Sequence, residues 1–235
     1  MDPLVLLPDL ERATTRLLNT VRGLTNLDLA APSLLPGWSR GHVLAHVARN
    51  ADSLCNLLTW ARTGVETPQY ASQEQRDADI EAGAPRPAAA QLEDLDASAG
   101  RFAAMADETP AEAWAARVRT RGGRHVVAAT LVWGRLREVE IHHVDLNAGY
   151  PVSAWSDTFS QHLLREVAAD FAGRSDALRA VLRALDLGRD LAIGEDGPVV
   201  EGPSHGIAAW LIGRSDGSDL TVGPEGPLPP VPAWR

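Results

Sequence analysis

Histidines and carboxylates recur at helical spacing in two segments of the chain, and their chemistry suits metal binding. His42 and His46 are four residues apart, and so are Glu138 and His142. Residues four apart lie on the same face of a helix. A catalytic zinc site uses three protein ligands, typically imidazole nitrogens and carboxylate oxygens, and leaves a fourth position open. One histidine of the first segment and the Glu138–His142 pair of the second would supply such a set.

The second segment offers another pair at helical spacing, Glu140 and His143. A line of ionisable residues also borders the apolar stripe of this segment: Arg135, Glu138, His142 and Asp145. We expect such a line to be partly buried, and a buried charge must be paired or bound to a metal. Histidines four apart are more often packing or hydrogen-bonding groups than ligands. Spacing alone therefore decides neither whether a metal binds nor which pair would hold it.

Two nucleophile patterns are present, and we reject both. Residues 213–217 match G-x-S-x-G, but that motif needs a helix after the serine, and the residues that follow disfavour one. The last histidine, His205, also precedes Ser215, whereas the motif expects it to follow. Cys55 lies among leucines, which indicates a buried, inert thiol.

The composition is that of an acidic globular protein. The chain has 235 residues and a formal net charge of −9, and its 22 basic residues are all arginine, which excludes every lysine-based mechanism. The negative charge argues against nucleic-acid binding. No apolar run approaches the roughly 18 residues of a membrane-spanning helix. A single cysteine and a start without a basic leader predict a cytoplasmic protein.

Helical periodicity predicts long helices over residues 3–29, 39–62, 88–106 and 128–147. Ser39 suits the N-cap of the second helix, and Gly64 ends it. The polar, proline-bearing residues 64–90 are predicted as a long surface loop with one short helical turn, and Gly122-Gly123 as the turn of a hairpin. The four helices suggest a bundle, whose core is a usual place for a metal or cofactor.

The character of the sequence changes near residue 150. A helix is predicted over residues 157–172, followed by short apolar stretches between glycines and prolines at 184–187, 190–193 and 198–200. A helix over 203–213 and an irregular tail over 224–232 complete the chain. We therefore predict an α+β protein with a helical bundle over residues 1–150 and a small α/β domain over residues 151–235.

Three stretches resemble the mycothiol-dependent maleylpyruvate isomerase family, a branch of the DinB-like metal-binding bundles: residues 35–52, 55–70 and 137–146. The first and third are typical of the broader metal-binding superfamily, and the second points to the isomerase. The resemblance continues weakly at residues 206–217, where these proteins carry a small sterol-carrier-protein-like α/β domain. It implies a DinB-like four-helix bundle followed by that domain.

The resemblance also implies functional residues. It makes His46, Glu138 and His142 the ligands of Zn²⁺ and places Arg214 near the substrate. The implied reaction is the mycothiol-dependent conversion of maleylpyruvate to fumarylpyruvate in gentisate degradation, by thiolate addition, bond rotation and elimination. Neither the residues that contact mycothiol nor the oligomeric state follow from it. Two alternatives stay open: a mycothiol S-transferase acting on a xenobiotic or biosynthetic intermediate, and a non-catalytic zinc-bound regulator.

Overall fold

The computed structural model describes residues 3–176 and 178–234 and divides into two compact units, Met1–Ala148 and Gly149–Arg235. The first unit is almost entirely helical, and the second contains a small sheet with helices beside it. The fold is therefore mixed α+β, as the sequence predicts. None of the described helices is long and apolar enough to cross a membrane.

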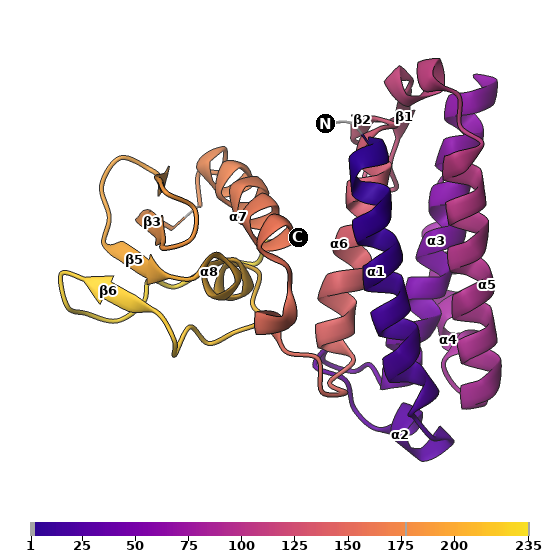
Figure 1. Ribbon diagram of the computed structural model, residues 1–235, viewed down its shortest axis with the longest axis horizontal. Helices are drawn as coiled ribbons and strands as arrows, with labels where there is room; N and C mark the ends of the chain where they lie inside the picture. The colour runs from indigo at the N-terminus through magenta and orange to yellow at the C-terminus, as the bar shows by residue number, and fades with distance from the viewer. Residues whose placement is uncertain (1–2, 177, 235) are drawn as a thin grey trace. The chain divides into compact units, whose positions relative to one another are not determined.

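Long helices form a bundle in the first unit (Figure 1). They are α1 (Pro3–Arg22), α3 (Arg40–Thr63), α5 (Ala88–Asp107) and α6 (Thr130–Asp145). Both α1 and α3 pack against α5 and α6, so the four enclose one core. Leu17, Leu57, Phe102 and Leu136 are almost fully buried in it. Burial of such side chains is the main source of stability for helices of this kind.

Shorter elements lie at the two ends of this bundle. The hairpin of β1 (Arg117–Arg119) and β2 (His125–Val127) follows the 3₁₀ helix η1 (Ala111–Ala115) at one end, and α2 (Asn26–Ala30) lies at the other (Figure 1). The hairpin turns where the sequence predicts, with Gly123 at a φ of 78°.

The bounds of α3 follow its predicted cap residues. The Ser39 side chain accepts from the backbone N–H of His42, and the His42 ring accepts from the backbone N–H of Ser39 in return. This reciprocal capping satisfies two N–H groups at the helix start. Gly64 ends the helix with a left-handed φ of 71°, a conformation that costs glycine little.

The structure differs from the sequence prediction in two helices. The helix predicted over residues 3–29 ends at Arg22, because Thr25 and Asp28 cap a separate helix, α2, through their side chains. The predicted loop over residues 64–90 contains α4 (Gln73–Gly83), which has 11 residues and starts at a Ser72 cap.

Helix α4 packs closely on the first half of α3, because glycines lie where the two helices meet. A Cβ atom at Gly41 would lie 2.2 Å from the carbonyl oxygen of Ala84, and one at Gly83 would lie 2.8 Å from the Cβ of Ala45. Real Cβ atoms do not approach other atoms so closely. The two glycines therefore allow α4 to lie beside the part of α3 that carries His46.

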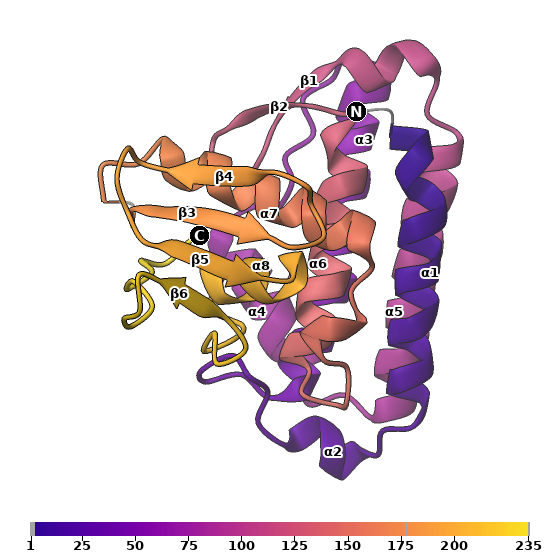
Figure 2. The same cartoon turned by 60° about the vertical axis from the view of Figure 1, so that its left-hand side comes forward.

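The second unit is a four-stranded sheet, within the described residues, with two helices beside it (Figure 2). The strands are β3 (Ala180–Ala184), β4 (Asp190–Ile193), β5 (Val199–Gly202) and β6 (Thr221–Gly223), in the order β4-β3-β5-β6. The β3–β5 pair is parallel and the other two pairs are antiparallel. The apolar stretch at 184–187 is mostly a turn, since β3 ends at its first residue.

Helices α7 (Asp157–Ala172) and α8 (Ser204–Leu211) pack against each other and against the strands. The 3₁₀ helix η2 (Val152–Ala154) precedes α7 and contacts α8. Phe171, Leu163, Leu182 and Ile207 are fully buried and form the core of this unit. This core is separate from that of the bundle, so each unit has its own apolar interior.

Candidate metal centre

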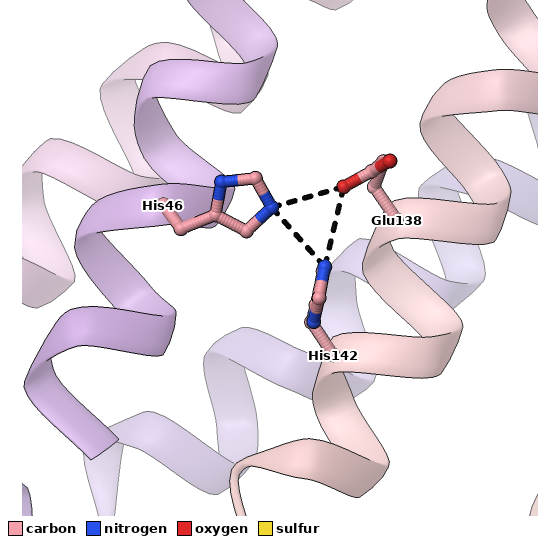
Figure 3. A group of neighbouring side chains, drawn as sticks. All are labelled: His46, Glu138 and His142. Atoms are coloured by element: carbon pink, nitrogen blue, oxygen red, sulfur yellow. Dashed lines mark hydrogen bonds and ion pairs between the residues drawn. The ribbon is translucent and has the colours of Figure 1, made fainter. Parts of the chain in front are cut away.

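The structure brings three of the predicted ligands together between α3 and α6 (Figure 3). His46 projects from α3, and Glu138 and His142 project from successive turns of α6. The two helices run antiparallel. Their opposite ends meet, since Nε of Arg40 at the start of α3 donates to the carbonyl of Leu146, just beyond the end of α6, at 2.9 Å. The first half of α3 therefore faces the second half of α6.

The spacing of the three ligand atoms fits a single divalent ion. Nε2 of His46 lies 3.1 Å from Oε2 of Glu138 and 3.1 Å from Nε2 of His142, and the latter two atoms are 3.3 Å apart. Zinc bonds of about 2.0–2.1 Å at tetrahedral angles separate neighbouring ligand atoms by roughly 3.3 Å. Two imidazole nitrogens and one carboxylate oxygen are also a ligand set found in catalytic zinc sites.

Burial and hydrogen bonding set the charges of these residues. Burial lowers the pKa of His142, but the hydrogen bonds to Asp145 and Glu138 outweigh it and raise the pKa to about 9. Burial disfavours the Glu138 carboxylate, yet hydrogen bonds from His142 and His46 hold its pKa well below the usual range. Burial also lowers the pKa of His46. At neutral pH, Glu138 is thus ionised and His46 uncharged, as metal ligands must be, whereas His142 must release a proton.

A buried carboxylate orients His142. Oδ2 of Asp145 lies 2.8 Å from Nδ1 of His142, and the Asp145 side chain is almost completely buried. A metal-ligating imidazole commonly donates its second N–H to such a carboxylate, which fixes the ring and leaves the other nitrogen free to bind. Asp145 therefore presents Nε2 of His142 to the other two ligands.

A buried arginine joins α6 to α3 one turn before the ligands. Nη1 of Arg135 donates to the carbonyl of Val47 at 2.7 Å and to Oδ1 of Asn50 at 2.9 Å. Burial lowers the pKa of Arg135 to about 10, so it remains a cation at neutral pH. These bonds hold the two ligand-bearing helices in register.

The alternative pair on α6 points to another helix. Oε1 of Glu140 accepts from Nη2 of Arg16 at 2.6 Å, and Nε2 of His143 lies 2.8 Å from Oγ1 of Thr20. Both partners belong to α1. His42 takes part in the cap of α3, and its Nε2 lies 3.4 Å from Glu81. The structure therefore places Glu140, His143 and His42 in structural contacts outside the His46–Glu138–His142 group.

Sequence reasoning missed two neighbours of His46. Nη2 of Arg76, on α4, lies 3.2 Å from Nδ1 of His46, and the Trp38 ring meets the His46 ring edge-on at 5.6 Å. A guanidinium only donates, so Nδ1 of His46 accepts this bond. An imidazole bound to a metal through Nε2 carries its hydrogen on Nδ1. Metal binding would therefore end the contact with Arg76. The sequence does carry a signal for α4, the helix that holds Arg76: Ser72 is a typical capping residue, and helix-forming residues follow it.

Cys55 is unsuited to nucleophilic attack. Burial, and then the nearby Asp52 carboxylate, raise the pKa of its thiol to about 11. The thiol is therefore protonated at neutral pH, whereas a nucleophilic cysteine needs the thiolate.

Arg214 and Ser215 lie in the second unit. Arg214 follows α8 and Gly213, and its Nη1 donates to the carbonyl of Ile212 at 2.9 Å. It lines a cavity of about 260 Å³ with the end of α8 and residues 231–234. Ser215 is followed by a turn and by β6, with no helix after it among the residues described up to 234.

The fold and the ligand group define a class of two-part proteins, in which a helical bundle with a ligand set for a divalent metal precedes a small α/β unit. Residues 10–147 match the family model described as the mycothiol maleylpyruvate isomerase N-terminal domain. The chain belongs to this family, which confirms the resemblance seen in the sequence.

Similarity to solved structures extends beyond that domain. A crystal structure of a mycothiol-dependent maleylpyruvate isomerase is 32% identical, with a TM-score of 0.89, over 98% of this chain and 97% of the other. A histidine-to-alanine mutant of such an isomerase gives the same values. A comparison with curated proteins finds no match. The likeness to solved structures therefore covers both units of the chain.

Proposed function

We propose that this chain is a zinc- and mycothiol-dependent isomerase that converts maleylpyruvate to fumarylpyruvate in gentisate degradation. The observation that carries the proposal is the His46–Glu138–His142 group, whose three ligand atoms lie 3.1–3.3 Å apart in a protein of this family. The reaction changes the geometry of a double bond. A thiolate adds to one carbon, the conjugated carbonyl becomes an enolate, the new single bond rotates, and the thiolate leaves again.

The residues of the bundle support the first requirement of this reaction, which is a thiolate. Cys55 cannot supply it at neutral pH, since its pKa is about 11. A metal ion held by His46, Glu138 and His142 would lower the pKa of a thiol bound beside it. Asp145 keeps His142 in the orientation that such an ion needs.

The second requirement is a cation for the substrate, which carries two carboxylates. We propose that Arg214 binds one of them or the enolate oxygen, because a guanidinium forms paired hydrogen bonds with a carboxylate. Glu138 and the thiolate neutralise much of the charge of a bound metal ion. Because Arg214 belongs to the second domain, residues 151–235, the proposal gives that domain a part in catalysis. We place the enzyme in the cytoplasm, where a reduced thiol cofactor persists.

Turnover of maleylpyruvate tests the proposal. We expect the zinc-loaded protein to isomerise maleylpyruvate only when mycothiol is present, as followed by absorbance. His142→Ala should abolish both bound zinc and turnover, whereas the neighbouring His143→Gln should keep both. Consumption of mycothiol without isomerisation would instead show an S-transferase. A protein that binds zinc and catalyses neither reaction would contradict the enzymatic assignment.

A further inference from the structure

A polar pocket of about 350 Å³ lies in the first unit, between the end of α3, the start of α4 and the β1–β2 hairpin. None of the three ligand residues His46, Glu138 and His142 lines it. Aromatic rings and hydrogen-bonding side chains line it, among them Trp60, Glu66, Gln69, Tyr70, Gln73 and Arg121. Its volume lies within the range of small-molecule sites.

The walls of this pocket are held by hydrogen bonds between segments. Oε1 of Gln69 accepts from the backbone N–H of Arg121 at 2.8 Å, and Nε2 of Gln69 donates to Oγ of Ser53 at 3.3 Å. The Arg121 guanidinium donates to the side-chain carbonyl of Gln73. Gln69 therefore connects the hairpin to α3, and Arg121 connects it to α4. A pocket braced in this way is formed before a ligand arrives.

The charges around the pocket suit a neutral ligand with many hydroxyl groups. The Arg119 guanidinium is paired with the Glu66 carboxylate, and Arg121 donates to an amide oxygen. The lining thus offers guanidinium and amide N–H donors together with carboxylate and amide acceptors. Hydroxyl groups both donate and accept, so they can use both kinds of partner. A dianion would find the acceptors unfavourable.

One residue connects this pocket to the ligand group. Tyr70 lines the pocket, and the guanidinium carbon of Arg76 lies 5.8 Å from the centre of its ring. Nη2 of the same Arg76 lies 3.2 Å from Nδ1 of His46. Arg76 therefore contacts both a lining residue of the pocket and a residue of the ligand group.

We propose that this pocket binds the head group of mycothiol, the inositol–glucosamine pseudo-disaccharide that carries the cysteine. Once the cysteine is attached to the glucosamine nitrogen through an amide, the head group is uncharged, and hydroxyls are its main polar groups. It would lie against Trp60 and Tyr70, with its hydroxyls on Gln69, Gln73 and Arg121. The cysteine arm would then pass Arg76 and bring its sulfur to the open position beside His46. This inference rests on the proposed function.

Two glutamines of α4 provide a matched test. Gln73 lines the pocket, whereas Gln75, two residues on, bonds to Asp79 and is not among the lining residues. We would titrate N-acetylglucosaminyl-inositol, a cysteine-free head group that keeps the neutral amide, into the zinc-loaded wild-type protein and into Tyr70→Ala, Gln73→Ala and Gln75→Ala. The dissociation constant should rise by about tenfold in Tyr70→Ala and by a smaller but measurable factor in Gln73→Ala, as expected for the loss of single contacts. It should stay unchanged in Gln75→Ala.

Steady-state kinetics separate this inference from the proposed function. In Tyr70→Ala, KM for mycothiol should rise, while kcat, KM for maleylpyruvate and zinc content stay near wild type. If the wild type isomerises maleylpyruvate but neither pocket variant changes head-group affinity, the pocket assignment fails and the function stands. A rise in KM for maleylpyruvate alone would assign the pocket to the substrate and overturn the inference. Head-group binding that depends on Tyr70, without isomerisation, would support the pocket and refute the function.

Discussion

Replacement of Asp145 by asparagine should weaken zinc binding while leaving all three ligands in place. The pKa of His142 is about 9, against an ordinary 6.5, and hydrogen bonds and charge interactions with Asp145 and Glu138 cause the rise. The difference corresponds to about 3 kcal/mol. Burial lowers this pKa, so the two carboxylates together contribute at least that much; with half of it assigned to Asp145, this residue favours a single positive charge on the ring by on the order of 2 kcal/mol, and a doubly charged ion by somewhat more.

The pH decides how much of this effect is visible. At pH 7 the variant loses the attraction of Asp145 for zinc, but its His142 also binds a proton less tightly and competes less with the metal. The two effects leave a net weakening of about tenfold. Near pH 9 the wild-type ring is already half deprotonated, so the compensation disappears and the weakening should approach about 100-fold, the upper end expected for such a partner.

Competition with a chromophoric chelator at pH 7 and pH 9 measures both values. Glu140→Gln is the matched control, because Glu140 is a buried carboxylate of the same helix that bonds to Arg16 instead of the ligand group. We expect it to lower the unfolding temperature and to keep wild-type zinc affinity. A folded Asp145→Asn protein that binds zinc as tightly as the wild type at both pH values would refute the reasoning. So would an equal loss of affinity in Glu140→Gln.

Three further predictions address other residues. Cys55→Ser should keep most of the turnover, because the thiol is protonated at neutral pH; loss of turnover in a folded, zinc-loaded variant would show that Cys55 reacts. Arg214→Ala should lower turnover by at least about tenfold with zinc content unchanged, and Arg214→Lys should recover little of it; wild-type kinetics in both variants would show that Arg214 does not bind the substrate. Burial and the charge of Arg16 lower the pKa of His143 to about 4 in the folded protein. Between pH 6.5 and pH 4, His143 is therefore protonated in the unfolded chain and neutral in the folded protein. Stability from this residue is present above pH 6.5 and is lost as pH falls, by about 2 kcal/mol between pH 7 and pH 5. Urea unfolding of His143→Gln should lack this part of the wild-type loss, and equal losses in the two proteins would contradict the assignment.

Local signals in the sequence determined where several elements begin and end. Ser39 and Gly64 bound α3 because a cap side chain and a left-handed glycine act within a few residues of the helix end. The hairpin at Gly122-Gly123 and the helix over 157–172 depend on similarly local preferences. The helical spacing of Glu138 and His142, and the residues around them, also sufficed to indicate a ligand pair and the family.

Contacts between distant segments decided what spacing left open. Glu138 and Glu140 are both at helical spacing from a histidine, and only the packing of α6 between α3 and α1 turns one toward His46 and the other toward Arg16. Helix α4 escaped prediction because its polar residues carry a weak periodic signal. Its position depends on the close approach of Gly41 and Gly83 to the facing helix. Arg76, which contacts His46, belongs to this helix. Sequence periodicity records which face of a helix is apolar, but the partner of each face is set by packing of the whole unit.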